Sequence, residues 1–131
     1  KEVAKSLVPG SHASTFGGNP LACAASAAVF EVIESEGLLD NATKMGNYTL
    51  EQIRNMAKEL DIIKEVRGVG LMIGIELTIP AAEVVKKCMD EGLLLNCTHD
   101  SVIRVMPQLN IKKEHIDEGL GILKNILKSV N

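Results

Sequence analysis

The spacing of apolar side chains along this chain, together with helix-boundary residues, predicts a succession of helices and strands. Long helices are expected over residues 20–36, 38–60, 80–91 and 112–129. In the last of these, one apolar stripe is expected to face the core and consists of Ile116, Leu120, Leu123, Ile126 and Leu127. A shorter helix is expected over residues 1–9, because Pro9 cannot continue it.

The apolar period changes after the second long helix. Residues 62–77 are rich in β-branched side chains and are interrupted by two glycines, which predicts two strands or one strand bent at a glycine bulge. Further strands are expected at 93–95 and 102–106, with a polar loop at 96–101 between them. The order α-α-β-β-α-β-β-α favours an α+β fold, with a mainly antiparallel sheet that helices cover.

The helix expected from Pro20 has an unusual surface, because no charged residue occurs in it before Glu31. Small or apolar residues occupy every side, and a helix of that kind is normally buried all round. A domain of 131 residues has little material to cover it. Part of its surface is therefore expected to face another domain or subunit, and the chain is expected to be a piece of a longer protein. The apolar run is too short to span a bilayer.

A loop of small polar residues, 10–19, precedes that helix. Its two adjacent glycines allow positive φ angles or the close approach of a ligand. Asn19 is a good N-cap, and Pro20 suits the first helical position. The hydroxyls of Ser14 and Thr15 lie just before the helix start, where donors commonly bind phosphate. By themselves these residues fit either an anion site or a plain connector that introduces a helix.

Composition narrows the classes of partner. The formal net charge is −3 and no basic stripe occurs, which argues against nucleic acid or an anionic membrane as the main partner. Hydrophobic residues make up 46% of the chain and aromatic residues only 2%, so the core must be built from aliphatic side chains. Cys23, Cys88 and Cys97 lack the spacing of a disulfide framework or a zinc site, and buried structural thiols are expected.

Residues 12–25 read His-Ala-Ser-Thr-Phe-Gly-Gly-Asn-Pro-Leu-Ala-Cys-Ala-Ala and carry a family resemblance. They resemble the segment that follows the cofactor lysine in class III (ornithine-type) aminotransferases. Later patches at 67–71, 74–77 and 104–107 are similar to the small C-terminal domain of the same family, so the resemblance covers nearly the whole chain. Within the family, these residues are most similar to those of the branch that acts on acetylornithine. One departure is Gln108, where the family often has a second proline.

The resemblance implies a particular domain organisation. Residues 1–19 would be the tail of the large pyridoxal-phosphate-binding domain of a fold-type I transferase, and residues 20–131 would be the linking helix and the C-terminal small domain. Pyridoxal 5'-phosphate would be the cofactor. The family's lysine, which holds this cofactor covalently, would lie before position 1. The 131 residues alone are therefore expected to contain no catalytic residue and to be inactive.

The resemblance also assigns roles to three side chains. Thr15 would donate its hydroxyl to the cofactor phosphate across a homodimer interface, with Ser14 as a weaker second donor. Arg104 would bind a substrate carboxylate through two parallel hydrogen bonds. The alternatives are a threonine that bonds a local carbonyl and an arginine on the solvent face of an edge strand.

Other polar residues are expected to have structural roles. A loop histidine such as His12 more often holds a loop together than acts as a base, and Arg67 is expected to be structural. His99 and Asp100 resemble a metal-binding pair only superficially, since no third ligand is near in sequence. His115 is expected to be solvated at a helix start.

The resemblance implies a reaction as well. The intact enzyme would transfer the side-chain amino group of N2-acetylornithine to 2-oxoglutarate, in arginine synthesis, as a cytoplasmic homodimer. Ornithine aminotransferase and 4-aminobutyrate aminotransferase are alternatives within the family. A non-catalytic α+β dimerisation or small-ligand module is the alternative outside it.

Overall fold

The computed structural model describes residues 2–130. Its elements follow the predicted order and are η1 (Val3–Ser6, a 3₁₀ helix), α1 (Pro20–Ser35), α2 (Leu38–Ala57), β1 (Ile63–Val69), β2 (Met72–Leu77), α3 (Ala82–Asp90), β3 (Asn96–Thr98), β4 (Val102–Val105) and α4 (Lys113–Val130). The chain divides into two compact units, the first ending at Glu36 and the second beginning at Gly37. Each unit is described here by itself.

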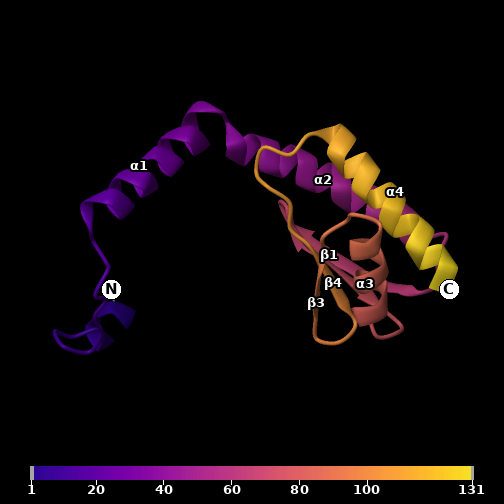
Figure 1. Ribbon diagram of the computed structural model, residues 1–131, viewed down its shortest axis with the longest axis horizontal. Helices are drawn as coiled ribbons and strands as arrows, with labels where there is room; N and C mark the ends of the chain where they lie inside the picture. The colour runs from indigo at the N-terminus through magenta and orange to yellow at the C-terminus, as the bar shows by residue number, and fades with distance from the viewer. Residues whose placement is uncertain (1, 131) are drawn as a thin grey trace. The chain divides into compact units, whose positions relative to one another are not determined.

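The second unit is a sheet of four strands that three helices cover on one face (Figure 1). The strand order is β1-β2-β4-β3, and each neighbouring pair is antiparallel. Helices α2, α3 and α4 all contribute buried side chains to the same hydrophobic cluster as the sheet. The predicted α+β class with a helix-covered antiparallel sheet is confirmed.

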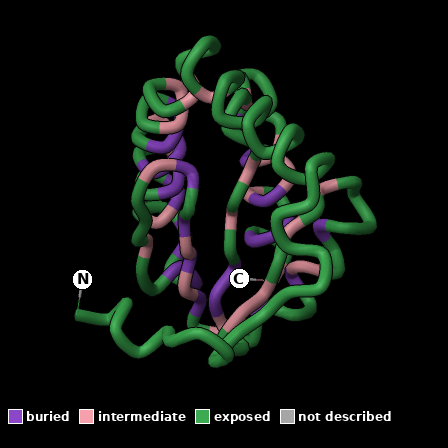
Figure 2. The backbone as a smooth tube through the Cα atoms, turned by 90° about the vertical axis from the view of Figure 1, so that its left-hand side faces the viewer, coloured by how far each residue is buried: buried purple, intermediate pink, exposed green. Residues whose placement is uncertain are grey.

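The core lies between the sheet and these helices, where the buried segments gather (Figure 2). Ile75 pairs with Val66 on one side and with Ile103 on the other, and this row of aliphatic side chains points toward the helices. The predicted stripe of α4 is confirmed, because its five residues are all buried. Gly46 of α2 touches the β1–β2 turn so closely that a Cβ there would lie 2.2 Å from the carbonyl oxygen of Gly70.

The other face of the sheet carries polar side chains. Because side chains alternate between faces along a strand, Arg67, Gly74 and Arg104 form one row across β1, β2 and β4 on this outer face. Arg67 and Arg104 are both exposed. The outer face of the second unit is therefore the surface on which polar chemistry can take place.

The first unit has no comparable core. Helix α1 and η1 contain no buried residue, and the side chains of Leu21 and Phe30 are 81% and 65% exposed. The N-terminal helix is shorter than predicted, covering only Val3–Ser6. None of the helices among residues 2–130 is long and apolar enough to cross a bilayer.

Two sequence-based expectations are wrong. The strand expected at 93–95 lies instead at 96–98, where the polar loop was expected. Its three residues pair with β4, whereas the leucines at 93–95 line an apolar pocket. The expectation of buried thiols holds for Cys88 only, because Cys97 is partly buried and Cys23 is exposed on α1.

Candidate functional site

The loop before α1 is held in shape by its own side chains. The hydroxyl oxygen of Ser14 accepts a hydrogen bond from the backbone N–H of Gly17 over 3.0 Å. A Cβ at Gly17 would lie 3.0 Å from the Cβ of Ser14, so a larger residue at this position would have to displace the Ser14 side chain. Gly18 follows with φ +74°, a conformation that other residues rarely adopt. The sequence therefore fixes a tight turn that presents Ser14 and Thr15, both exposed.

Asn19 caps helix α1, as the sequence predicts. Its Oδ1 accepts a hydrogen bond from the backbone N–H of Ala22 over 2.9 Å, and its Nδ2 donates to the carbonyl of Phe16 over 2.7 Å. The helix therefore satisfies part of its own N-terminus, and Pro20 has no N–H to offer. An anion at this loop would depend chiefly on the hydroxyls of Ser14 and Thr15.

Arg104 lies on the outer face of the sheet in the second unit. It pairs in register with Gly74 of β2 and with Asn96 of β3. Its neighbours along the strand, Ile103 and Val105, pack with the core on the opposite face. Arg104 forms no ion pair with any residue in the range 2–130, and its side chain is exposed. The guanidinium is therefore available to a negatively charged ligand.

Arg67, two strands away on the same face, is engaged by carboxylates. Its Nη1 donates to Glu76 over 2.9 Å and to Glu65 over 3.1 Å. Lys64 also binds Glu76, and the hydrogen bonds from Lys64 and Arg67 lower the pKa of the Glu76 carboxyl. Arg67 thus has the structural role predicted for it, whereas Arg104 has no such partner among the described residues.

The remaining candidates show no catalytic cluster. His12 is exposed in the loop of the first unit, and His115 is exposed at the start of α4, as expected. His99 and Asp100 form the β3–β4 turn with φ angles of +49° and +57°. In the stretch from residue 2 to residue 130, no three His, Cys, Asp or Glu side chains lie close enough together to hold a metal ion.

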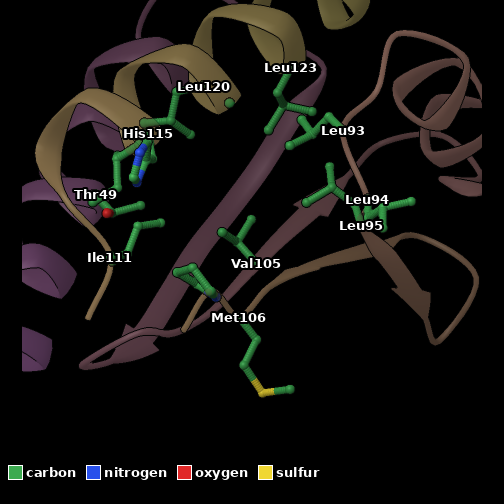
Figure 3. A pocket seen from close by; sticks show the side chains of 13 residues that line it. Thr49, Leu93, Leu94, Leu95, Val105, Met106, Ile111, His115, Leu120 and Leu123 are labelled. Atoms are coloured by element: carbon green, nitrogen blue, oxygen red, sulfur yellow. The ribbon is translucent and has the colours of Figure 1, made fainter. Parts of the chain in front are cut away.

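An apolar pocket of about 130 Å³ lies on the helix-covered side of the second unit (Figure 3). Leu93 and Leu95 line one side of it, while Leu120 and Leu123 of α4 line another. His115 stands at this pocket together with the hydroxyl-bearing Thr49, whose Oγ1 donates to the carbonyl of Met45 over 2.7 Å. The lining includes neither Arg104 nor the loop hydroxyls, so the pocket is separate from the candidate site.

Asn96 falls where the sequence predicts a polar loop, but it lies on the edge strand β3 and pairs directly with Arg104. A polar residue at this position carries no local signal of function. Only the pairing of β3 with β4 makes Asn96 the cross-strand neighbour of Arg104.

Comparisons with known proteins define the class. A family model described as class-III aminotransferase matches residues 1–127. The acetylornithine aminotransferase of Methanocaldococcus jannaschii is 45% identical over 130 residues, which cover 99% of this chain and 33% of that protein. The ornithine aminotransferase of Bacillus subtilis is 45% identical over 129 residues, covering 98% of this chain and 32% of that protein.

Solved structures agree with the sequence comparisons. The acetylornithine aminotransferase of Elizabethkingia anophelis superposes with a TM-score of 0.85 at 32% identity, over 97% of this chain and 34% of that one. The ornithine aminotransferase of Plasmodium yoelii superposes with a TM-score of 0.89 at 34% identity, and the match covers 99% of this chain and 35% of that one. The chain belongs to the class-III aminotransferase family. It spans about a third of the length of the relatives it matches.

Class-III aminotransferases depend on pyridoxal phosphate, and the loop of the first unit suits the phosphate of that cofactor. Ser14 uses its hydroxyl oxygen as an acceptor from Gly17, so its own O–H remains able to donate. The exposed hydroxyl of Thr15 is a second donor on the same turn. A phosphate group, with several acceptor oxygens, matches a set of hydroxyl donors next to glycines.

Proposed function

We propose that this chain forms the C-terminal third of an aminotransferase that moves the side-chain amino group of N2-acetylornithine to 2-oxoglutarate. The observation that carries the proposal is the contrast on the outer sheet face. Arg67 is neutralised by two carboxylates, whereas the exposed Arg104 has no ion-pair partner among the described residues. An arginine held free of carboxylate partners suits a substrate that carries its own carboxylate. The names of the relatives support the amino donor.

In the proposed enzyme the loop of the first unit binds the cofactor phosphate. The hydroxyl of Thr15 donates to a phosphate oxygen, and the hydroxyl of Ser14 provides a second hydrogen bond. When bound, pyridoxal phosphate supplies the carbonyl that takes up and releases the amino group. The residues of this chain contribute binding and orientation: Arg104 holds the substrate by its carboxylate and so fixes its amino group relative to the cofactor.

The remaining parts of the proposal concern the intact protein. The site is shared between the two chains of a homodimer, with Thr15 reaching the cofactor of the partner, and the enzyme works in the cytoplasm in arginine synthesis. Residues 1–19 end the large domain, and residues 20–131 form the linking helix and the C-terminal small domain. The 131 residues alone do not catalyse transamination, because the family's cofactor lysine lies outside them.

The identity of the amino donor is tested by a panel on the intact enzyme. N2-acetylornithine, ornithine and 4-aminobutyrate are offered at equal concentrations with 2-oxoglutarate, and kcat/KM is measured for each. We expect the acetylated donor to give the highest value. A higher value for ornithine would favour the second activity that appears among the relatives' names. No turnover with any donor, and no cofactor absorbance, would support a non-catalytic module.

The role of Arg104 is tested by Arg104→Lys in the intact enzyme. Lysine keeps the positive charge but loses the two parallel N–H donors of the guanidinium. Binding of the carboxylate substrates should weaken by about 1.5–3 kcal/mol, the usual value of a hydrogen bond to a charged group. Arg54→Lys on the exposed surface of α2 is the matched control and should leave the kinetics unchanged. Unchanged KM values in Arg104→Lys would remove this residue from the site.

A further inference from the structure

We propose that Asn96 is a second binding residue for the same carboxylate, acting beside Arg104 as a determinant of substrate specificity. The inference rests on the proposed function of Arg104. Asn96 and Arg104 are direct cross-strand partners in the antiparallel pair β3–β4. Side chains of directly paired residues lie on the same face of a sheet, with Cβ atoms about 4.5–5.5 Å apart. The carboxamide and the guanidinium therefore rise side by side from the outer face.

The surroundings of this pair leave room for a ligand. Gly74, the partner of Arg104 on the other side, has no side chain, and the atoms nearest to where its Cβ would be belong to Val102 and Arg67, at 3.5 Å or more. Strand β3 is the edge of the sheet, so no further strand formed by residues 2–130 flanks Asn96. Both Asn96 and Arg104 are exposed. A small carboxylate can thus approach both side chains at once.

The charges of the outer face direct an anion to this pair. Lys64 and Arg67 are balanced by Glu65 and Glu76 through ion pairs of 2.5–3.1 Å. Apart from these residues and Arg104, the paired positions on this face are uncharged: Val69, Met72, Gly74, Asn96, Thr98 and Val102. Arg104 therefore carries the unbalanced positive charge of the face, and Asn96 stands next to it.

The chemistry of asparagine suits this position. Its side-chain amide has two N–H donors, of which one can bond a carboxylate oxygen while the guanidinium of Arg104 bonds the carboxylate on its other side. An aspartate at this position would neutralise the guanidinium and repel the ligand. A neutral donor strengthens carboxylate binding without adding charge. The expected ligands are small carboxylic acids, such as the amino and keto acids of a transamination.

The experiment compares Asn96→Ala, Asn96→Asp and Arg104→Lys in the intact enzyme. The readouts are the inhibition constant of glutarate, an unreactive dicarboxylate, and KM against kcat for 2-oxoglutarate. Asn96→Ala should weaken the binding of glutarate by about tenfold, because one hydrogen bond to a charged group is lost. Asn96→Asp should weaken it further, since it removes the donor and adds a negative charge. The changes should appear in KM and in the inhibition constant more than in kcat.

The matched control is Asn47→Asp, which makes the same change of charge at an exposed position on α2. It should leave glutarate binding unchanged. Urea midpoints of all variants establish that each is folded, and an exposed position on an edge strand should tolerate both Asn96 changes.

The outcomes separate the two proposals. Suppose that Arg104→Lys weakens glutarate binding while both Asn96 variants bind glutarate as Asn47→Asp does. The proposed binding role of Asn96 is then overturned, and that of Arg104 stands. An effect confined to Asn96→Asp that disappears at high salt would reveal a remote charge effect and would also overturn it. If Arg104→Lys itself has no effect, the carboxylate site on this face is wrong, and the role of Asn96 is rejected with it.

Discussion

The two units of this chain use apolar residues in opposite ways. Helix α1 is apolar or small over most of its length, yet none of its residues is buried. Helix α2 is more polar as a whole, yet it buries Met45, Leu50 and Ile53 because its apolar residues form one stripe. A core therefore depends on the arrangement of apolar side chains more than on their number. The exposed surface of α1 suits contact with further protein, which the family's longer relatives contain.

The glycines of the two units differ in the same sense. In the first unit, Gly10 and Gly18 adopt positive φ angles, and nothing lies within 4 Å of where a Cβ would be. In the second unit, Gly46 and Gly68 allow backbones to touch. Positive φ angles also occur in the second unit, for example at Gly92, so the units differ chiefly in the close backbone contacts at Gly46 and Gly68. Mutations should consequently affect global stability in the second unit and local structure or binding in the first.

The largest expected effect is that of Ile75→Ala in the centre of the sheet. Ile75 is 0% exposed, so its truncation removes buried area and leaves a cavity. The free energy of unfolding should fall by about 2–5 kcal/mol in urea denaturation. The contrasting variant is Val29→Ala on α1, where the side chain is 57% exposed. It should change stability by less than about 0.5 kcal/mol. Equal losses would show that α1 folds cooperatively with the core.

Thr15→Val tests the binding role of the first unit. The substitution keeps the shape of the side chain and removes the hydroxyl. Cofactor affinity of the intact enzyme should fall by about 1.5–3 kcal/mol, the usual range for a hydrogen bond to a charged group. Urea stability should be unchanged, because Thr15 is exposed in a loop. Titration followed by cofactor absorbance measures the effect, and unaltered affinity would leave the loop as a plain connector.

Gly46→Ala tests the close packing of the second unit. The added Cβ would lie 2.2 Å from the carbonyl oxygen of Gly70, and this backbone cannot move without disturbing the β1–β2 turn. The free energy of unfolding should fall by about 1–3 kcal/mol, although alanine favours helices more than glycine does. Gly121→Ala in α4 is the matched control, because nothing lies within 4 Å of its Cβ position. It should stabilise the protein by up to about 1 kcal/mol.

Asn19→Ala should weaken helix α1 without unfolding the second unit. The change removes the cap on the N–H of Ala22 and the hydrogen bond to Phe16. A lost N-cap costs about 0.5–2 kcal/mol. Hydrogen exchange of the α1 amides should accelerate, while that of the sheet should not change. Faster exchange in both units would contradict the separation of the two.

The smallest expected effect concerns Asp117 of α4, which binds Lys113 over 2.6 Å and accepts a hydrogen bond from Tyr48 of α2. These contacts, chiefly the one with Lys113, lower the pKa of the Asp117 carboxyl. A lowered pKa in the folded state contributes stability above the unfolded value, about 3.9. That contribution is lost as the pH falls through the folded value. Asp117→Asn should therefore lower the urea midpoint at pH 7, and the difference from the parent protein should shrink as the pH falls below about 3.9.

Much of the fold could be predicted because it rests on local chemistry. The cap at Asn19, the start of α1 at Pro20 and the stripe of α4 depend on residues within a few positions of one another. The candidate residues Ser14, Thr15 and Arg104 came from a resemblance rather than from any local pattern. The structure places each of them at an exposed position. Their roles in binding remain predictions.

Sequence alone determined the four long helices and the class of fold, because periodicity and turn residues act over short distances. It left open whether residues 62–77 form two strands or one bent strand, and the structure shows the antiparallel pair β1–β2. Only the tertiary structure decided that the third strand lies at 96–98 and not at 93–95. Strand pairing joins residues that are not neighbours in sequence. The leucines at 93–95, just before β3, line a pocket together with residues of α4 instead of forming the strand. Pairing of β1 with β2 brings Arg67 to Glu76, and pairing of β3 with β4 makes Asn96 the neighbour of Arg104, which has no carboxylate partner among the described residues.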